Sequence, residues 1–430
     1  MKNFFSYNRW VLGFIALAFV IRLPLLWHMD YTNFPEFYRD YYVSSQITRG
    51  HWPLAGPPSM QTDFRFGPVY YYLLAPLFWL GNKSPAALIL TGILLYALSA
   101  GVCYKLFLRW FSDGYAAKLG ALFYAVSIYG LHLTSYISNP NFLPLFVLLY
   151  FYYLTKILED GGQVSDYIFL GLSYGIAAQI HATAALVLPL AGFVPIFISR
   201  KILAKTLSLK KIIGLVVSFI LVSLPYLIYN IADNFRGVLA LLNFSSGHLQ
   251  GGKSAAGAQA LLSFWSACLN PFDLNNGYTY LQPNSLYVIV AAAAAIVLAL
   301  MIVKVFRYYS KIDDNPKPPI ISHLGAIIVF SWLVAGCLMV LLFNRAIHDH
   351  YLIIFWPLPA VFVAFAGQWL KDKLRLTAGL VMLVLIISLL QAYSLFSLST
   401  QSWSNFWPAY QSRYQNDPNT PNIGFSPMQQ

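Results

Sequence analysis

Long apolar segments recur along most of this chain and constrain its fold more than any other feature. A membrane-spanning helix needs about 20 mainly apolar residues, and about eleven segments meet or approach that length. They are 10–28, 86–108, 115–137, 140–157, 167–181, 183–199, 212–230, 285–304, 321–343, 350–369 and 377–397. Only 10% of the residues are charged, whereas soluble proteins carry about a quarter. The sequence therefore predicts an all-α polytopic membrane protein.

Basic residues predict the orientation of these segments, because Lys and Arg accumulate in cytoplasmic loops. Of the 27 Lys and Arg residues, 18 lie on the side of the N-terminus and eight on the opposite side. We therefore expect the N-terminus inside, the C-terminus outside, and large outer loops at 29–85 and 231–284. Residues 1–397 would form one transmembrane domain in the cell (inner) membrane, followed by an extracytoplasmic tail at 398–430. Topology thus accounts for much of the net charge of +12, and no nucleic acid partner is expected.

The first outer loop contains an acidic residue in an aromatic setting. If residues 36–49 form a helix, Asp40, Val43 and Ile47 share one face and place the carboxylate between apolar and wet surroundings. Such a carboxylate could accept a proton from a hydroxyl or hold a metal. The alternative is a salt bridge to Arg39 or Arg65, or simple solvation.

Residues 68–80 are apolar but short for a crossing. Pro68 suits a helix start, and Gly81 with Asn82 suits a stop. We predict an amphipathic helix on the outer surface, where tyrosine and tryptophan rings are favoured. The alternative is a short tilted crossing, which would invert the topology downstream.

Other polar residues gather near the predicted outer ends of spans. Arg22 lies in the outer third of the first span and could clamp a lipid phosphate or snorkel to headgroups. His181, at the turn between two short spans, could bind phosphate or be a satisfied buried histidine. Arg345 could bind phosphate. His348 and His350 could join Asp349 as metal ligands if they lie in a loop, or the cluster could simply cap the span.

No inner loop is long enough for a nucleotide-sugar domain, and no Gly-rich phosphate loop is present. If the protein transfers a sugar, the donor must therefore be reached from the bilayer or from outside. This favours a lipid-linked donor.

Several ordered motifs resemble those of the GT-C glycosyltransferases, in particular the protein O-mannosyltransferases and bacterial aminoarabinose transferases. The resemblance covers roughly residues 1–370. The motifs are RLPLLW, an acidic residue in the first outer loop, GPVYYYLLAPLFWLG, SNPNFLPLFVLLYFYYL, QIHATAALVLPL and HDHYLIIFWPLPA.

The resemblance implies a GT-C fold, a polyprenyl-phosphate-linked sugar donor, an active site facing the periplasm or exterior, and inverting transfer. It maps the general base onto Asp40, with Glu36 as the runner-up. His181 stands where the family often has Lys, and Asn139 and Asn141 stand where it often has a second acidic residue. The candidate donor and phosphate residues are Arg22, His181, Arg345, His348, His350 and Tyr351. The candidate acceptor cleft contains Arg65, Tyr70, Tyr71, Asn139 and Asn141.

The expected partners are the lipid-linked donor, membrane lipids and a glycan, lipid or protein acceptor. No metal ligand is assigned, and a divalent metal is left open. The main alternative function is a transporter or flippase for a lipid-linked oligosaccharide or sugar lipid. That class typically has internal repeats and ionisable residues at mid-membrane, neither of which is evident. A polysaccharide ligase or polymerase would be expected to have several Arg residues in a long late loop, whereas Arg236 is the only one in 231–284. A membrane scaffold leaves Asp40, Arg22 and Arg345 without a role.

Overall fold

The computed structural model of this chain describes residues 2–26, 35–59, 62–111, 113–246, 321–343 and 349–369. This part is built from helices, with two isolated β-bridges, Pro58–Arg65 and Phe111–Ile321. The helices of the first half are α1 (Lys2–Arg22), η1 (Leu23–Leu26), α2 (Pro35–Ile47), α3 (Val69–Leu80), α4 (Pro85–Trp110), α5 (Gly114–Val126), α6 (Ile128–Ser135), η2 (Asn139–Phe142), α7 (Leu143–Asp160) and α8 (Val164–Ile180). They continue as α9 (Ala182–Ile198), α10 (Arg200–Thr206), α11 (Leu209–Ala232), α12 (Arg236–Ser246), α15 (His323–Phe343), α16 (Asp349–Leu352), η3 (Ile353–Phe355) and α17 (Leu358–Trp369).

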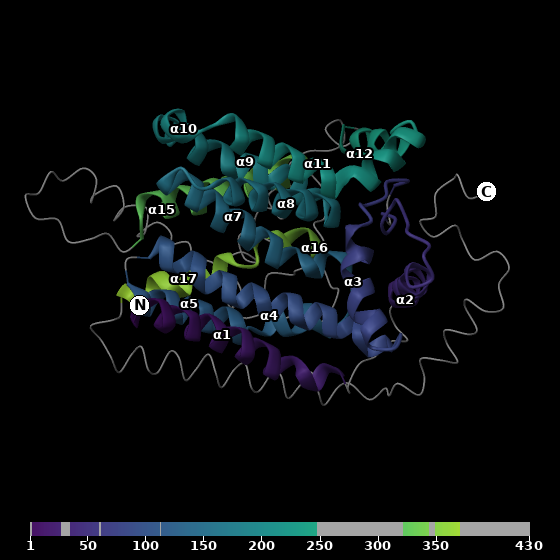
Figure 1. Cartoon of the computed structure of the whole chain (residues 1–430), viewed down its shortest axis with the longest axis horizontal. Coiled ribbons are helices and arrows are strands. Elements are labelled where there is room, and N and C mark those ends of the chain that lie inside the picture. Colours follow the sequence, from purple (N-terminus) through teal and green to yellow (C-terminus); the bar gives the residue numbers. More distant parts are fainter. Residues whose placement is uncertain are drawn as a thin grey trace, which may run out of the picture.

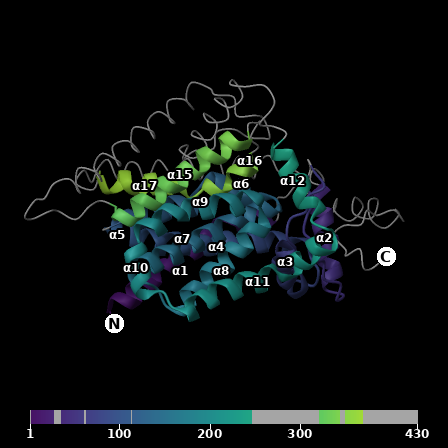
Figure 2. The ribbon, with the colours of Figure 1, turned by 90° about the horizontal axis from the view of Figure 1, so that it is seen from above.

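The long helices run side by side, and the short helices of the first loop lie across one end (Figure 1). Helices α1, α4, α5 and α17 pack as one group, whereas α8, α9, α11 and α15 flank α7 in a second group. Helix α7 joins the groups by packing against α4. From above, α2, α3 and α12 again lie at the end opposite the N-terminus (Figure 2).

Four helical segments in the described ranges are long and apolar enough to cross a membrane. They are Arg9–Leu26, Pro85–Trp110, Asn139–Asp160 and Leu209–Ala232, and the bent pair α9–α10 would make a fifth. The predicted spans 285–304 and 377–397 lie outside the described residues, so the full number of spans stays a prediction. A multi-pass, all-helical membrane fold is confirmed.

Two predicted spans are not single helices. The segment 115–137 breaks at Ser127, whose backbone is extended and whose hydroxyl accepts a hydrogen bond from the Gly130 N–H. The segment 350–369 divides into α16, η3 and α17. Apolar length alone predicts one helix in each place. A capping serine in the first segment and a short 3₁₀ turn in the second interrupt the helix without changing the hydropathy of the segment.

The short helix predicted after Pro68 is confirmed as α3. Pro68 occupies its N-cap, and Gly81 its C-cap. Asn82 and Lys83 then adopt positive φ angles of 51° and 60°, a conformation that cannot continue a helix. Because α3 stands across the ends of the long helices in Figure 1, its apolar residues pack over the bundle end rather than along it.

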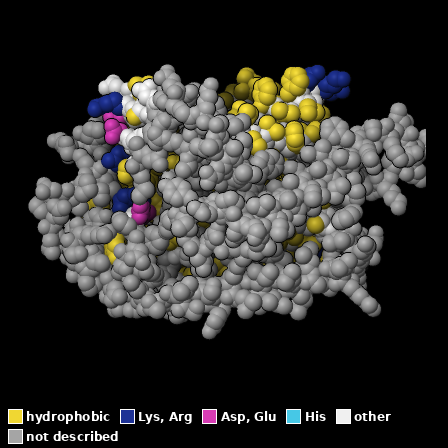
Figure 3. Space-filling view, turned by 180° about the vertical axis from the view of Figure 1, so that it is seen from behind, with side chains coloured by type: hydrophobic (Ala, Val, Ile, Leu, Met, Phe, Trp, Pro, Cys, Tyr) yellow, Lys and Arg dark blue, Asp and Glu magenta, His cyan; other side chains and the backbone are white. Residues whose placement is uncertain are grey.

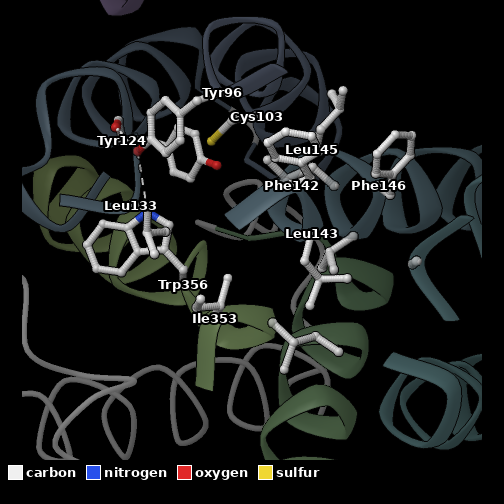
Figure 4. Close-up of a cluster of buried hydrophobic side chains, with 14 of the residues drawn as sticks. Tyr96, Cys103, Tyr124, Leu133, Phe142, Leu143, Leu145, Phe146, Ile353 and Trp356 are labelled. Carbon is white, nitrogen blue, oxygen red and sulfur yellow. Dashed lines mark hydrogen bonds between the residues drawn. The ribbon is translucent and has the colours of Figure 1, made fainter. Parts of the chain in front are cut away.

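An aromatic hub joins the α1–α4–α5 group to η3. The rings of Tyr96 and Tyr124 stack with centroids 5.1 Å apart, and Trp356 Nε1 donates to the Tyr96 hydroxyl over 3.3 Å (Figure 4). The Tyr96 hydroxyl in turn donates to the Tyr124 carbonyl at 2.8 Å. Buried tyrosine and tryptophan need such partners for their polar atoms, so these bonds fix how the two parts of the chain meet.

Candidate active site

Asp40 lies on the buried face of α2. The expected shared face is confirmed, since Asp40, Val43 and Ile47 are all buried, but the expected wet boundary is wrong, because Asp40 is fully enclosed. Arg39 donates to Oδ1 of Asp40 from Nε and Nη2, both at 2.7 Å. The hydroxyl of Tyr70, on α3, donates to Oδ2 at 2.6 Å. Both carboxylate oxygens are therefore engaged, and the salt bridge to Arg39 that the sequence left as an alternative is present.

Burial and charge act on Asp40 in opposite directions. Loss of water raises the pKa of the Asp40 carboxyl, while the Arg39 charge and the Tyr70 hydrogen bond lower it; burial prevails and the pKa is raised. The nearby Glu36 carboxylate adds to the rise. A carboxylate held in this way is a stronger base than one in water, which suits proton abstraction.

Two tyrosines of α3 complete the surroundings of this carboxylate. Tyr70 and Tyr71 are fully buried, and the Tyr70 ring lies 5.2 Å from the ring of Phe142 in η2. Burial raises the pKa of the Tyr71 hydroxyl, and the charges of Arg39 and Arg65 oppose the rise. Both hydroxyls therefore stay protonated at neutral pH and can act as hydrogen-bond donors.

His181 caps α9 and lies between two aromatic rings. Its Nδ1 is 2.8 Å from the Thr183 hydroxyl and accepts from the Thr183 N–H at 3.3 Å. The imidazole stacks on Phe66 with centroids 5.5 Å apart and meets the edge of Tyr351 at 5.4 Å. Sequence pattern does not predict this contact, because Phe66 and His181 are brought together only by docking of the first loop.

The two asparagines of η2 also bind backbone carbonyls at this end of the bundle. Asn139 donates to the Ile180 carbonyl at 2.7 Å, and Asn141 donates to the Tyr136 carbonyl at 3.1 Å. Their amides fix η2 to the α8–α9 junction and to the end of α6. The short helix α16 packs beside η2, which brings Tyr351 to the same end as Asp40.

Arg22 is buried in the protein instead of reaching the headgroups. Its Nη1 donates to the carbonyls of Ala18 and Ala125 at 2.9 and 2.8 Å, and its guanidinium lies 3.9 Å from the Tyr96 ring centroid. No carboxylate contacts Arg22 within the residues that the structure describes. The snorkelling alternative is therefore wrong, and the guanidinium belongs to the aromatic hub.

The late polar cluster lies largely outside the described residues. Arg345 and His348 fall in the undescribed segment 344–348, and His350 lies in α16 without a described side chain. In the described ranges, no three His, Cys, Asp or Glu residues group to hold a metal ion. The described candidates that the fold brings together at one end are Asp40, Tyr70, Tyr71, Arg65, Asn139, Asn141, His181 and Tyr351.

Docking of the first loop depends on a close backbone approach at Gly67. The Gly67 N–H donates to the Gln179 carbonyl at 2.9 Å, and a Cβ on Gly67 would meet the Gln179 Cβ and Cγ at 2.4 Å. We expect Gly67→Ala to destabilise the protein by about 1–3 kcal/mol through overpacking, measured as a lower midpoint of thermal unfolding in detergent. Gly13→Ala is the control, because a Cβ there meets nothing within 4 Å. Equal midpoints for both variants would contradict this docking.

Comparison with known proteins gives a family match over part of the chain and a similar fold. The model of the family described as dolichyl-phosphate-mannose-protein mannosyltransferase matches residues 65–229. ArnT from Cupriavidus metallidurans bound to undecaprenyl phosphate has a similar structure, with a TM-score of 0.52 and 14% identity, covering 86% of this chain and 63% of ArnT. Archaeal oligosaccharyltransferase AglB from Archaeoglobus fulgidus, in complex with an inhibitory peptide and a dolichol-phosphate, gives a TM-score of 0.49 and 14% identity, covering 96% of this chain and 59% of AglB. No curated protein matches the sequence.

These matches bear differently on the candidate residues. The family match includes Tyr70, Asn139 and His181 but begins after Asp40. This chain spans less than two thirds of the length of either solved chain. The fold shared with ArnT covers 86% of this chain. Over residues 65–229 the chain is thus similar to this family of membrane mannosyltransferases, and its fold is similar to that of ArnT.

Proposed function

We propose that this protein transfers a sugar from a polyprenyl-phosphate donor to a hydroxyl acceptor on the extracytoplasmic face, with inversion at the anomeric carbon. The observation that carries the proposal is the buried Asp40 carboxylate, bonded to Tyr70, at one end of a GT-C bundle. The acceptor is a glycan, a lipid or a protein.

The donor class rests on the absence of a cytosolic sugar-nucleotide domain and on the relatives. ArnT was solved with undecaprenyl phosphate, and the matched family takes its description from dolichyl-phosphate mannose. We infer that a related lipid phosphate enters from the outer leaflet of the inner membrane. The excess of Lys and Arg on the side of the N-terminus supports this orientation.

In the proposed reaction, Asp40 is the general base. The acceptor hydroxyl replaces Tyr70 as the donor to Oδ2, and its proton passes to that oxygen as its own oxygen attacks the anomeric carbon. The bond from that carbon to the phosphate oxygen breaks on the opposite face, and the lipid phosphate leaves with the electron pair. Asp40 is thus protonated at the end of the step and returns its proton to water.

The leaving phosphate needs positive charge or hydrogen-bond donors. We place the donor phosphate near His181 and Tyr351, whose rings meet at the same bundle end as Asp40. We propose that the phosphate is also bound by three residues just before Tyr351 in the sequence, Arg345, His348 and His350. Arg22 is a weaker candidate, because its guanidinium is enclosed by Tyr96 and the end of α5. No step is routed through a metal, since N–H and O–H donors already engage both oxygens of Asp40.

The test is to incubate the purified protein with undecaprenyl-phosphate-linked hexoses and pentoses, together with glycan, lipid and peptide acceptors. We expect one donor to release undecaprenyl phosphate only when a suitable acceptor is present. Proton NMR of the product should then show an anomeric configuration opposite to that of the donor. Retained configuration would overturn the proposed single displacement, and movement of intact donor across a bilayer without transfer would favour a flippase.

A further inference from the structure

A short basic helix lies at the bundle end opposite Asp40. Helix α9 bends by 82° into α10 at a single residue, Ser199. A helix nearly perpendicular to its own span lies along the membrane plane when the span crosses the bilayer. Four exposed basic side chains follow from α10 into the start of α11. They are Arg200, Lys201, Lys205 and Lys210.

The α7–α8 turn holds this bend in place. Lys211 Nζ donates to the carbonyls of Gly161 and Thr206 at 2.9 and 2.8 Å. Gly161 has φ of 75°, and a Cβ there would meet Thr206 Cβ at 2.4 Å, so the two backbones approach closely. Lys211 thus fixes α10 against the α7–α8 turn.

Acidic side chains nearby do not neutralise these charges. Glu159 and Asp160, at the end of α7, both pair with Arg109. Asp166 pairs with Lys156. Lys201, Lys205 and Lys210 make no ion pair with any residue that the structure describes. The surface therefore has an unbalanced positive charge.

An apolar surface adjoins the basic one. Large apolar side chains of α9 stand exposed directly before the bend, and Figure 3 shows this yellow patch beside dark-blue Lys and Arg side chains. Its exposed residues are Phe193, Val194, Ile196, Phe197 and Ile198. An apolar belt next to a row of cations complements the acyl chains and the phosphate group of a lipid.

We propose that α10, with the adjoining ends of α9 and α11, binds the headgroups of anionic phospholipids. This site lies in the leaflet opposite the one that would supply the donor, and it does not depend on transfer activity. Its cations would attract the lipid phosphate, and the bend would keep them level with the headgroups.

The test compares short-chain phosphatidylglycerol with short-chain phosphatidylcholine, added to the full chain in a neutral detergent and counted as bound lipid by native mass spectrometry. We expect phosphatidylglycerol to bind more tightly. The triple variant Lys201→Gln, Lys205→Gln, Lys210→Gln should weaken its binding at least about ten-fold, and added salt should weaken wild-type binding. The charge-matched control Arg49→Gln, Lys83→Gln, Arg236→Gln alters exposed cations at the other end and should bind as wild type does.

Three results would overturn this site. Equal affinity for the two lipids would show that the site has no headgroup preference. An equal loss of phosphatidylglycerol affinity in both triple variants would show that binding depends only on the net charge of the protein. Full displacement of phosphatidylglycerol by inorganic phosphate at matched ionic strength would indicate a site for the free ion instead.

Discussion

Replacing Asp40 with asparagine is expected to lower sugar transfer by about 10²- to 10⁴-fold, the usual contribution of a positioned general base. Asparagine has nearly the same shape: its Oδ1 can accept from Arg39, and its Nδ2 can donate to the Tyr70 hydroxyl, which then acts as acceptor, so the packing between α2 and α3 should persist. It cannot take up a proton from the acceptor. The measurement is the rate of undecaprenyl phosphate release with the donor and acceptor identified for the wild type.

Glu36 gives the matched control for this variant. It lies one turn before Asp40 on the same helix, is half-buried, and is close enough to raise the pKa of Asp40. Glu36→Gln should keep transfer within about ten-fold of wild type, since it removes only a neighbouring charge. If Glu36→Gln abolishes transfer and Asp40→Asn does not, the base is Glu36. An Asp40→Asn protein that elutes as a monodisperse peak and retains full activity would refute the assignment.

Predictions from local pattern succeed in the loop between α1 and α4. The spacing of Asp40, Val43 and Ile47 defines one helical face, and Pro68 with Gly81 brackets α3, because caps and periodicity are properties of neighbouring residues. The same information could not reveal that the Tyr70 hydroxyl binds Asp40. Thirty residues separate them, and the contact depends on how α3 crosses the bundle end.

For polar residues near span ends, the sequence alone leaves several roles possible. An arginine in the outer third of a span has the same sequence signature whether it snorkels, binds phosphate or stacks on a tyrosine. Only the packing of α1 against α4 and α5 places Arg22 on Tyr96. Likewise, the break at Ser127 could not be seen from apolar length, because a capping serine needs only one N–H three residues on.

Replacing Tyr70 with phenylalanine is expected to move the acidic limb of the pH–rate profile to higher pH. The Tyr70 hydroxyl stabilises the ionised form of Asp40 and so lowers its pKa, while burial raises it. Without the hydroxyl, one of the interactions that lower the pKa of Asp40 is lost, so the rise caused by burial becomes larger. Since transfer needs the carboxylate, activity should be lost at a higher pH than in the wild type. At pH values above that limb, the transfer rate should stay within about ten-fold of the wild-type rate, because Asp40 itself remains.

The pH dependence of folding stability should also depend on the hydrogen bond between Tyr70 and Asp40. A carboxyl whose pKa is higher in the folded state binds its proton more tightly there, so stability falls as pH rises from the unfolded pKa to the folded one. Tyr70→Phe raises the folded pKa further and should extend that fall to higher pH, seen as a larger total drop in the thermal midpoint between acidic and neutral pH. Tyr72→Phe is the control, since its hydroxyl donates to the Pro53 carbonyl and leaves Asp40 unaltered. An acidic limb that coincides with that of the wild type, or moves to lower pH, would show that Tyr70 does not set the basicity of Asp40.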